Sequence, residues 1–119
     1  MKFQKLHHQA KRASRLLKAI GNERRLIVLC HLADGEKSVG ALEDLVGLSQ
    51  SALSQHLARL RRDNIVRTRR AAQTIYYSLA SGAPLGILQS LHELFDPEAA
   101  QDAGNASGNS AKSAGVDSH

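Results

Sequence analysis

The sequence has few of the residues on which several classes of protein depend. One cysteine among 119 residues excludes a disulfide framework within the chain, and it excludes a two-thiol redox switch within one subunit. No run of about 18 apolar residues could span a bilayer. The first ten residues, MKFQKLHHQA, also lack the apolar stretch of an export signal. We therefore expect a soluble protein of the reducing cytoplasm.

Acidic residues are scarce until the C-terminal end. Residues 1–95 carry fifteen Lys and Arg against seven Asp and Glu, whereas residues 96–119 carry one against four. Residues 97–119 are mostly Ala, Ser, Gly and Asn, and they cannot bury enough apolar surface to offset the entropy of ordering. We expect one small domain over residues 1–96 and a disordered acidic tail over 97–119. The basic domain favours a polyanion such as nucleic acid.

Apolar residues recur at intervals of three and four, which predicts helices over about residues 3–20, 23–33, 39–46, 50–63 and 84–95. Gly21 is expected to end the first helix in the left-handed conformation, and Asn22, Ser38 and Ser49 to cap the next three. The side chains expected to face inward on the second and third helices are Leu26, Leu29, Cys30 and Ala33, then Val39, Leu42, Leu45 and Val46.

The middle of the chain has the order of a winged helix. Gly47-Leu48-Ser49 joins two predicted helices as in a helix-turn-helix. Residues 65–69 and 74–79 are rich in β-branched and tyrosyl side chains, and they predict a hairpin around residues 70–73. The predicted fold class is mainly α with a two-stranded β-hairpin. It is a winged helix-turn-helix in the order α-α-α-α-β-β-α.

The helix over residues 50–63 and the hairpin carry the pattern of a DNA-binding surface. The helix begins with Gln and Ser side chains, which can bond base edges in the major groove. Between residues 49 and 79 there are six arginines and one acidic residue, Asp63. Arg67 and Arg69 are expected on one side of a strand as phosphate contacts, with Arg70 and Gln73 near the tip and the minor groove. A solvated, charged strand edge that resists aggregation is the alternative.

Three stretches resemble the ArsR/SmtB family of bacterial winged-helix repressors. They are GNERRL at residues 21–26, VGLSQSALSQHL at 46–57 and TRRAAQTIYY at 68–77. Within the family, the last two are similar to its nodulation-repressor and redox-responsive branches. The resemblance implies a homodimer, joined by the first and last helices, that binds an inverted-repeat operator in double-stranded DNA and blocks transcription.

The resemblance also implies site residues. The reading positions are Gln50, Ser51, Ser54, Gln55 and His56, with Arg59 toward the DNA backbone. His56 is either a base or phosphate contact or a residue of the helix surface. The dimer interface falls on Phe3, Leu6, Ala10, Ala13, Leu17, Leu88, Leu91 and Phe95. The residues themselves permit a dimer, because both terminal helices have apolar stripes that a small core cannot fully cover.

Sensor sites of the family have no full counterpart here. Residues 39–43 lack the cysteines of the family's thiol site. The last helix offers only His92 and Glu93 of the family's zinc site, so we expect no metal cofactor.

Cys30 matches the first cysteine of the redox branch, but the position of the second cysteine falls on Asp96. We expect Cys30 to be a small core residue. The alternatives are a thiol sensor using Cys30 or a winged-helix module that binds a protein. No catalytic constellation is present, and we do not expect an enzyme.

Overall fold

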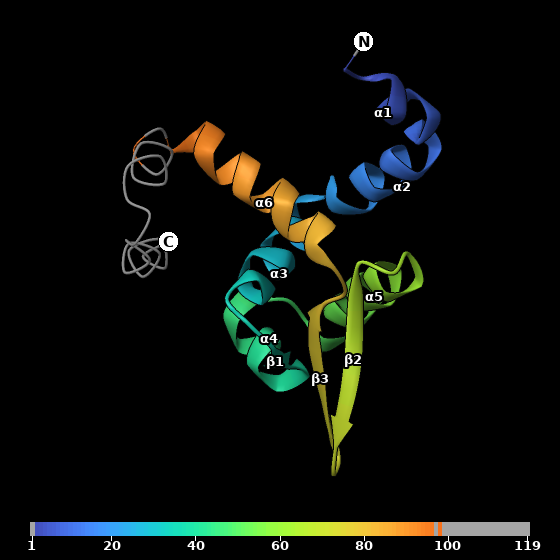
Figure 1. Ribbon diagram of the computed structural model, residues 1–119. Helices are drawn as coiled ribbons and strands as arrows, with labels where there is room; N and C mark the ends of the chain where they lie inside the picture. Colours follow the sequence, from blue (N-terminus) through green and yellow to red (C-terminus); the bar gives the residue numbers. More distant parts are fainter. Residues whose placement is uncertain (1, 97, 99–119) are drawn as a thin grey trace. The chain divides into compact units, whose positions relative to one another are not determined.

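The structure is a computed structural model that describes residues 2–96 and 98 (Figure 1). Its elements, in chain order, are α1 (Gln4–His8), α2 (Ala10–Ile20), α3 (Glu23–Ala33), β1 (Lys37–Ser38), α4 (Val39–Val46), α5 (Gln50–Arg62), β2 (Val66–Ala71), β3 (Thr74–Leu79) and α6 (Gly82–Phe95). The predicted winged helix-turn-helix is confirmed. The predicted tail lies outside the described residues, apart from Glu98. None of the helices within these residues is long and apolar enough to cross a membrane.

The chain divides into two units, which we describe separately. The first extends to Leu85 and the second begins at Gly86. The first unit contains all elements from α1 to β3, and the hairpin of β2 and β3 extends downward past α4 in Figure 1. We call residues 66–79, the hairpin with its loop, the wing. In the second unit the described residues are the remainder of α6, where Leu94 and Phe95 are 72% and 83% exposed, together with Asp96 and Glu98.

The N-terminal segment differs from the prediction in two respects. It forms two helices, because Gln9 leaves the helical conformation with φ −105° and ψ 15°. The spacing of Leu6, Ala10 and Ala13 continues across this break, so periodicity alone did not reveal it. Gly21 is also not left-handed, since its φ is −75°. A glycine fits there because a Cβ would lie 2.9 Å from the Leu17 carbonyl oxygen.

The predicted helix caps are confirmed. The side chains of Asn22, Ser38 and Ser49 accept hydrogen bonds from backbone N–H groups at the starts of α3, α4 and α5, at 3.1, 3.0 and 3.2 Å. Each cap satisfies a donor that has no partner within the helix. Gly47 ends α4 with φ +70°, which glycine adopts without steric cost. The turn between α4 and α5 is therefore fixed at both ends.

The core lies between α3, α4, α5 and the sheet. Its side chains are at most 8% exposed and include Val28, Leu29, Leu32, Leu42, Val46, Leu53, Leu57, Leu60, Ile65 and Val66. Two inward faces were predicted wrongly in part. On α3 the buried side is centred on Val28, Leu29 and Leu32, which leaves Cys30 and Ala33 exposed. On α4, Leu45 is 47% exposed, because Leu42 and Val46 define the inward face.

The sheet has one strand more than predicted. Its order is β1-β3-β2, with both pairs antiparallel, and Lys37 and Ser38 pair with Tyr77 and Tyr76. Two residues are too few to show an alternating pattern in the sequence. Strand β2 also runs further than predicted, to Ala71, so Arg70 belongs to the strand and pairs with Ile75. The loop at the tip consists of residues 72 and 73.

Candidate nucleic-acid interface

The N-terminal half of α5 presents polar side chains to solvent. Leu53, Leu57 and Leu60 are at most 2% exposed and fix the inward side of the helix. Gln50, Ser51, Ser54 and Gln55 are all exposed. These side chains can both donate and accept hydrogen bonds, which the edges of base pairs require. The structure therefore brings the four predicted reading residues together at the end of α5 that follows the turn.

His56 and Arg59 lie in a different environment from those four residues. Both are half-buried. Partial burial lowers the pKa of His56, and the positive charges of Arg25 and Arg24 on α3 lower it further. The imidazole is therefore predominantly neutral at neutral pH. It can still donate or accept a hydrogen bond, but it adds little positive charge to a DNA-binding surface.

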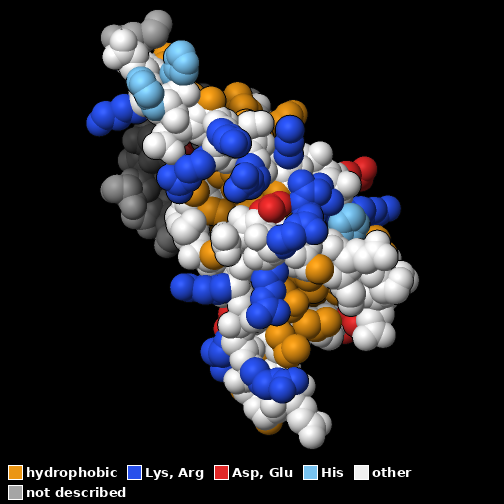
Figure 2. Space-filling view, turned by 90° about the vertical axis from the view of Figure 1, so that its right-hand side faces the viewer, with side chains coloured by type: hydrophobic (Ala, Val, Ile, Leu, Met, Phe, Trp, Pro, Cys, Tyr) orange, Lys and Arg blue, Asp and Glu red, His pale blue; other side chains and the backbone are white. Residues whose placement is uncertain are grey.

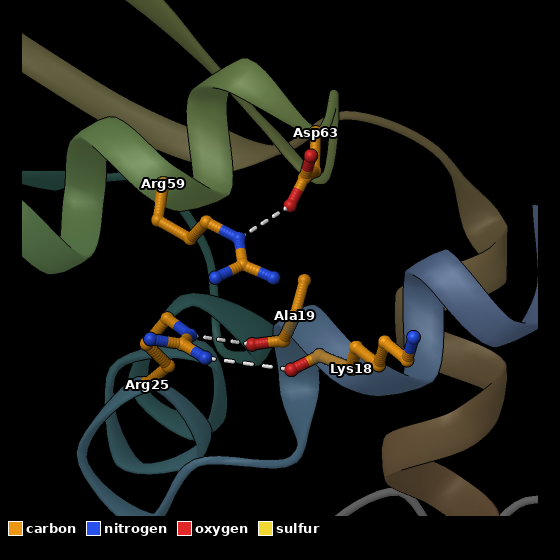
Figure 3. A network of polar contacts seen from close by, with 5 residues as sticks. All are labelled: Lys18, Ala19, Arg25, Arg59 and Asp63. Carbon is orange, nitrogen blue, oxygen red and sulfur yellow. Dashed lines mark hydrogen bonds and ion pairs between the residues drawn. The ribbon is translucent and has the colours of Figure 1, made fainter.

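Two sets of polar contacts lie close together where α5 approaches the helices that precede it (Figure 3). Arg59 Nε donates to Asp63 Oδ2 at 2.7 Å. The Arg25 guanidinium donates to the carbonyl oxygens of Ala19 at 2.6 Å and Lys18 at 3.4 Å, at the C-terminal end of α2. Helix C-termini favour cations at this position.

The Arg25 guanidinium points to the carbonyl oxygens of α2 in Figure 3, and the positive charge of Arg59 also acts on it. Partial burial and the charge of Arg59 lower the pKa of Arg25, while Asp63 raises it. Asp63 thus offsets part of the repulsion between the two arginines. Neither Arg25 nor Asp63 was among the site residues predicted from the sequence. The one available signal was that Asp63 is the only acid between residues 49 and 79.

A groove of about 590 Å³ separates α5 from the wing. It is lined by Val39, Ser54, Leu57, Ala58, Arg61, Arg62, Ile75 and Tyr77. Arg61 and Arg62 are exposed in the last turn of α5, and neither was among the predicted site residues. Their position in an arginine-rich helix end was the available signal. Figure 2 shows a face where Lys and Arg side chains predominate over Asp and Glu, with hydrophobic side chains exposed between them.

The wing carries the other predicted contacts. Arg67, Arg69, Arg70 and Gln73 are all exposed. Side chains alternate along a strand, so Arg67 and Arg69 share one face of the sheet and Arg70 lies on the other. Arg70 pairs with Ile75, which lines the groove beside α5. Of these three arginines, Arg70 therefore shares the side of the wing that faces the reading helix.

Arg69 is already engaged in an ion pair. Its Nη2 and Nε donate to Glu36 Oε1 and Oε2 at 2.7 and 3.0 Å. The guanidinium carbon lies 4.6 Å from the centroid of the Tyr76 ring. The hydrogen bond from Arg69 lowers the pKa of Glu36, and the same bond raises the pKa of Arg69. Both side chains are thus charged at neutral pH. Glu36 was not among the site residues predicted from the sequence.

Four of the eight predicted dimer residues line a groove on the N-terminal helices. Leu6, Ala10, Ala13 and Leu17 line a hollow of about 550 Å³. Phe3, Leu6 and Leu17 are 65%, 52% and 57% exposed. On α6, Leu88 is buried, Leu91 is half-buried and Phe95 is exposed. The dimer interface remains a prediction, supported by the exposure of large apolar side chains.

Cys30 is exposed on α3, which corrects its prediction as a core residue. Its sulfur is nevertheless partly covered. This desolvation, together with the charge of Asp34, raises the pKa of the thiol. A raised pKa disfavours the reactive thiolate. Within residues 2–96 and 98, no group of three or more His, Cys, Asp or Glu side chains is placed to hold a metal ion.

Comparisons with known proteins agree with this geometry. Residues 22–68 match the family model of the bacterial regulatory proteins of the arsR family. The transcriptional activator HlyU of Vibrio cholerae is 50% identical over 95 residues, covering 80% of this chain and 88% of HlyU. The nodulation protein NolR of Rhizobium meliloti is 53% identical over 89 residues, covering 75% and 73%.

A solved structure is similar over the same part of the chain. The transcriptional repressor BigR of Xylella fastidiosa is 36% identical, with a TM-score of 0.76 over 80% of this chain and 97% of BigR. The similarity therefore covers the helices and the wing together.

Proposed function

Since this chain belongs to the ArsR family of bacterial regulatory proteins, we propose that it is a transcriptional repressor that binds an inverted-repeat DNA operator as a homodimer. One observation carries the proposal. The polar end of α5, with Gln50, Ser51, Ser54 and Gln55 exposed, lies beside a wing that bears exposed arginines. A major groove admits such a helix, and phosphates attract such a wing.

Each part of the interface has a proposed task. Gln50, Ser51, Ser54 and Gln55 read base edges in the major groove, where glutamine can bond adenine through two hydrogen bonds. Arg67, Arg61 and Arg62 contact phosphates, whereas Arg70 and Gln73 contact the backbone or the minor groove near the tip. His56 and Arg59 lie closer to α3. We assign His56 a neutral hydrogen bond to DNA, whereas the Arg59 side chain is held by its ion pair with Asp63 at the end of the same helix.

The proposed dimer follows from the exposed apolar side chains. The hollow along α1 and α2, lined by Leu6, Ala10, Ala13 and Leu17, is one part of the interface. Apolar residues of α6, including Leu91 and Phe95, are the other. A two-fold dimer of this kind places its reading helices about 34 to 36 Å apart, which is one turn of DNA. The operator is therefore expected to contain two half-sites in inverted orientation.

Repression by this protein would act through occupancy. A dimer seated on an operator that overlaps a promoter excludes the polymerase. The names of the relatives include both an activator and a repressor. We propose repression, without a metal effector and without catalysis, in the cytoplasm where the DNA lies. The raised pKa of Cys30 weighs against a thiol sensor.

Enrichment of bound duplexes from a random library, followed by titration of the full-length protein, tests the proposal. We expect the enriched duplex to bind about a thousandfold or more tighter than random DNA at physiological salt. Equal affinity for both would contradict sequence reading. Binding to no duplex, together with capture of a protein partner that resists nuclease, would favour the protein-interaction module. Unchanged oxidant response of Cys30→Ser would exclude the thiol sensor.

A further inference from the structure

We propose that Glu36 and Arg69 form a strap that positions the wing, so that Arg69 acts in DNA binding through Glu36 rather than by contacting phosphate. The inference rests on the proposed DNA-binding function and concerns the same surface. It assigns Glu36 a role as a positioning residue, and it separates the task of Arg69 from that of the neighbouring Arg70.

The strap crosses the whole width of the sheet. The strand order is β1-β3-β2, so Glu36, which directly precedes β1, and Arg69 of β2 lie on opposite sides of β3. The Arg69 side chain passes over Tyr76 of β3 and meets both carboxylate oxygens of Glu36, at 2.7 and 3.0 Å. A guanidinium held by two parallel hydrogen bonds has a fixed orientation as well as a fixed position.

The strap adds to a connection that is otherwise short. Strand β1 pairs with β3 through two residues only, Lys37 and Ser38. Ser38 is also the residue that caps α4, the first helix of the helix-turn-helix. A link from the residue before β1 to β2 therefore ties the wing to the start of α4. We infer that this tie sets where the tip of the wing lies relative to α5.

The faces of the sheet support the same division of tasks. Arg69 pairs with Tyr76, whereas Arg70 pairs with Ile75. Ile75 and Tyr77 line the groove beside α5, so Arg70 is on the side of the reading helix and Arg69 is on the opposite side. The charge of Arg69 is also compensated by Glu36, which leaves Arg70 as the uncompensated cation of this pair of neighbours.

The strap and a direct contact between Arg69 and phosphate predict opposite effects of Glu36→Gln on DNA affinity. If Arg69 bound phosphate and Glu36 only masked it, Glu36→Gln would strengthen DNA binding, because it removes a negative charge. With a strap, Glu36→Gln and Arg69→Met both weaken binding to the enriched duplex by roughly three- to tenfold, because the wing is in its binding position in a smaller fraction of molecules. The matched control is Asp44→Asn, which removes the same charge from an exposed position on α4 and should not weaken binding.

A charge exchange tests the pair itself. The double variant Glu36→Arg with Arg69→Glu keeps the net charge and can restore the ion pair in reverse. We expect it to bind the enriched duplex more tightly than Arg69→Glu alone, because the strap is rebuilt. Hydroxyl-radical footprints should show that Glu36→Gln loses protection of the sugars where the wing lies but keeps it on the backbone beside the reading helix. Thermal melting of each variant confirms that the fold is retained.

Two results would overturn the strap while leaving the proposed function intact. One is tighter DNA binding by Glu36→Gln than by the unmodified protein, and the other is a charge exchange that binds no better than Arg69→Glu. If the unmodified protein itself fails to select any duplex, the proposed function fails and the role of the strap in DNA binding fails with it.

Discussion

Replacing Arg70 by alanine should flatten the salt dependence of DNA binding by an amount that follows from the dimer. Four exposed arginines per chain, Arg61, Arg62, Arg67 and Arg70, lie on α5 or the wing outside the two ion pairs of Arg59 and Arg69. A dimer offers eight such cations. If each neutralises one phosphate, the logarithm of the affinity falls with the logarithm of salt concentration with a slope of about −7.

Arg70→Ala removes two of these contacts per dimer. The slope should become shallower by about 1.8, which makes the variant lose roughly tenfold less affinity than the unmodified protein between about 50 and 200 mM salt. Fluorescence anisotropy with the enriched duplex at a series of salt concentrations measures both slopes. Arg70→Lys keeps the charge and serves as the control. An unchanged slope for Arg70→Ala would refute the phosphate contact, and a change of about half this size would argue against two wings on one site.

Three further substitutions test the reading helix and its support. Gln50→Ala should weaken binding to the enriched duplex by about 5- to 150-fold and leave random DNA unaffected, because a bidentate base contact contributes about 1–3 kcal/mol of discrimination; equal losses on both in a gel-shift titration would remove its reading role. Leu53→Ala, at a side chain with no exposure, should lower the free energy of unfolding by about 3–5 kcal/mol in urea titration, and a loss below about 1 kcal/mol would contradict its place in the core. His56 has a pKa below its ordinary value in the folded state, so the unfolded chain binds more protons between the two values and stability should rise with pH across that window. His56→Gln should remove this rise in urea titrations between about pH 5 and 7.5, and its persistence would assign the effect to another group.

Features of the fold that depend on neighbouring residues could be predicted from the sequence. Asn22, Ser38 and Ser49 cap their helices as expected, because a cap needs only its own side chain and a donor three residues on. Gly47 ends α4 for a similarly local reason. The turn before the reading helix could therefore be predicted from local chemistry. The exposure of Gln50 at the start of that helix could be predicted for the same reason.

Features that depend on tertiary contact could not be predicted in the same way. Strand β1 exists because β3 lies beside it, and its two residues carry no pattern of their own. Cys30 was placed on the wrong face of α3 because several adjacent residues of that helix are apolar, so the spacing allowed more than one inward side.

The candidate site shows the same limit. Its arginines were visible in the sequence, but their partners were not. Glu36 and Arg69 are 33 residues apart, and only the order of strands in the sheet brings them together. The pairing of Arg59 with Asp63 involves neighbours on one helix turn, yet the approach of Arg25 to both depends on how α3 packs against α5. Composition therefore indicated a basic surface, while the division of tasks among its arginines required the structure.

The sequences that the full-length protein enriches from random double-stranded DNA test the central claim most directly. We expect an inverted repeat whose half-site centres lie about 10 to 10.5 base pairs apart, bound by two copies of the chain. Enrichment of a single half-site bound by one copy, or no enrichment at all, would contradict the account.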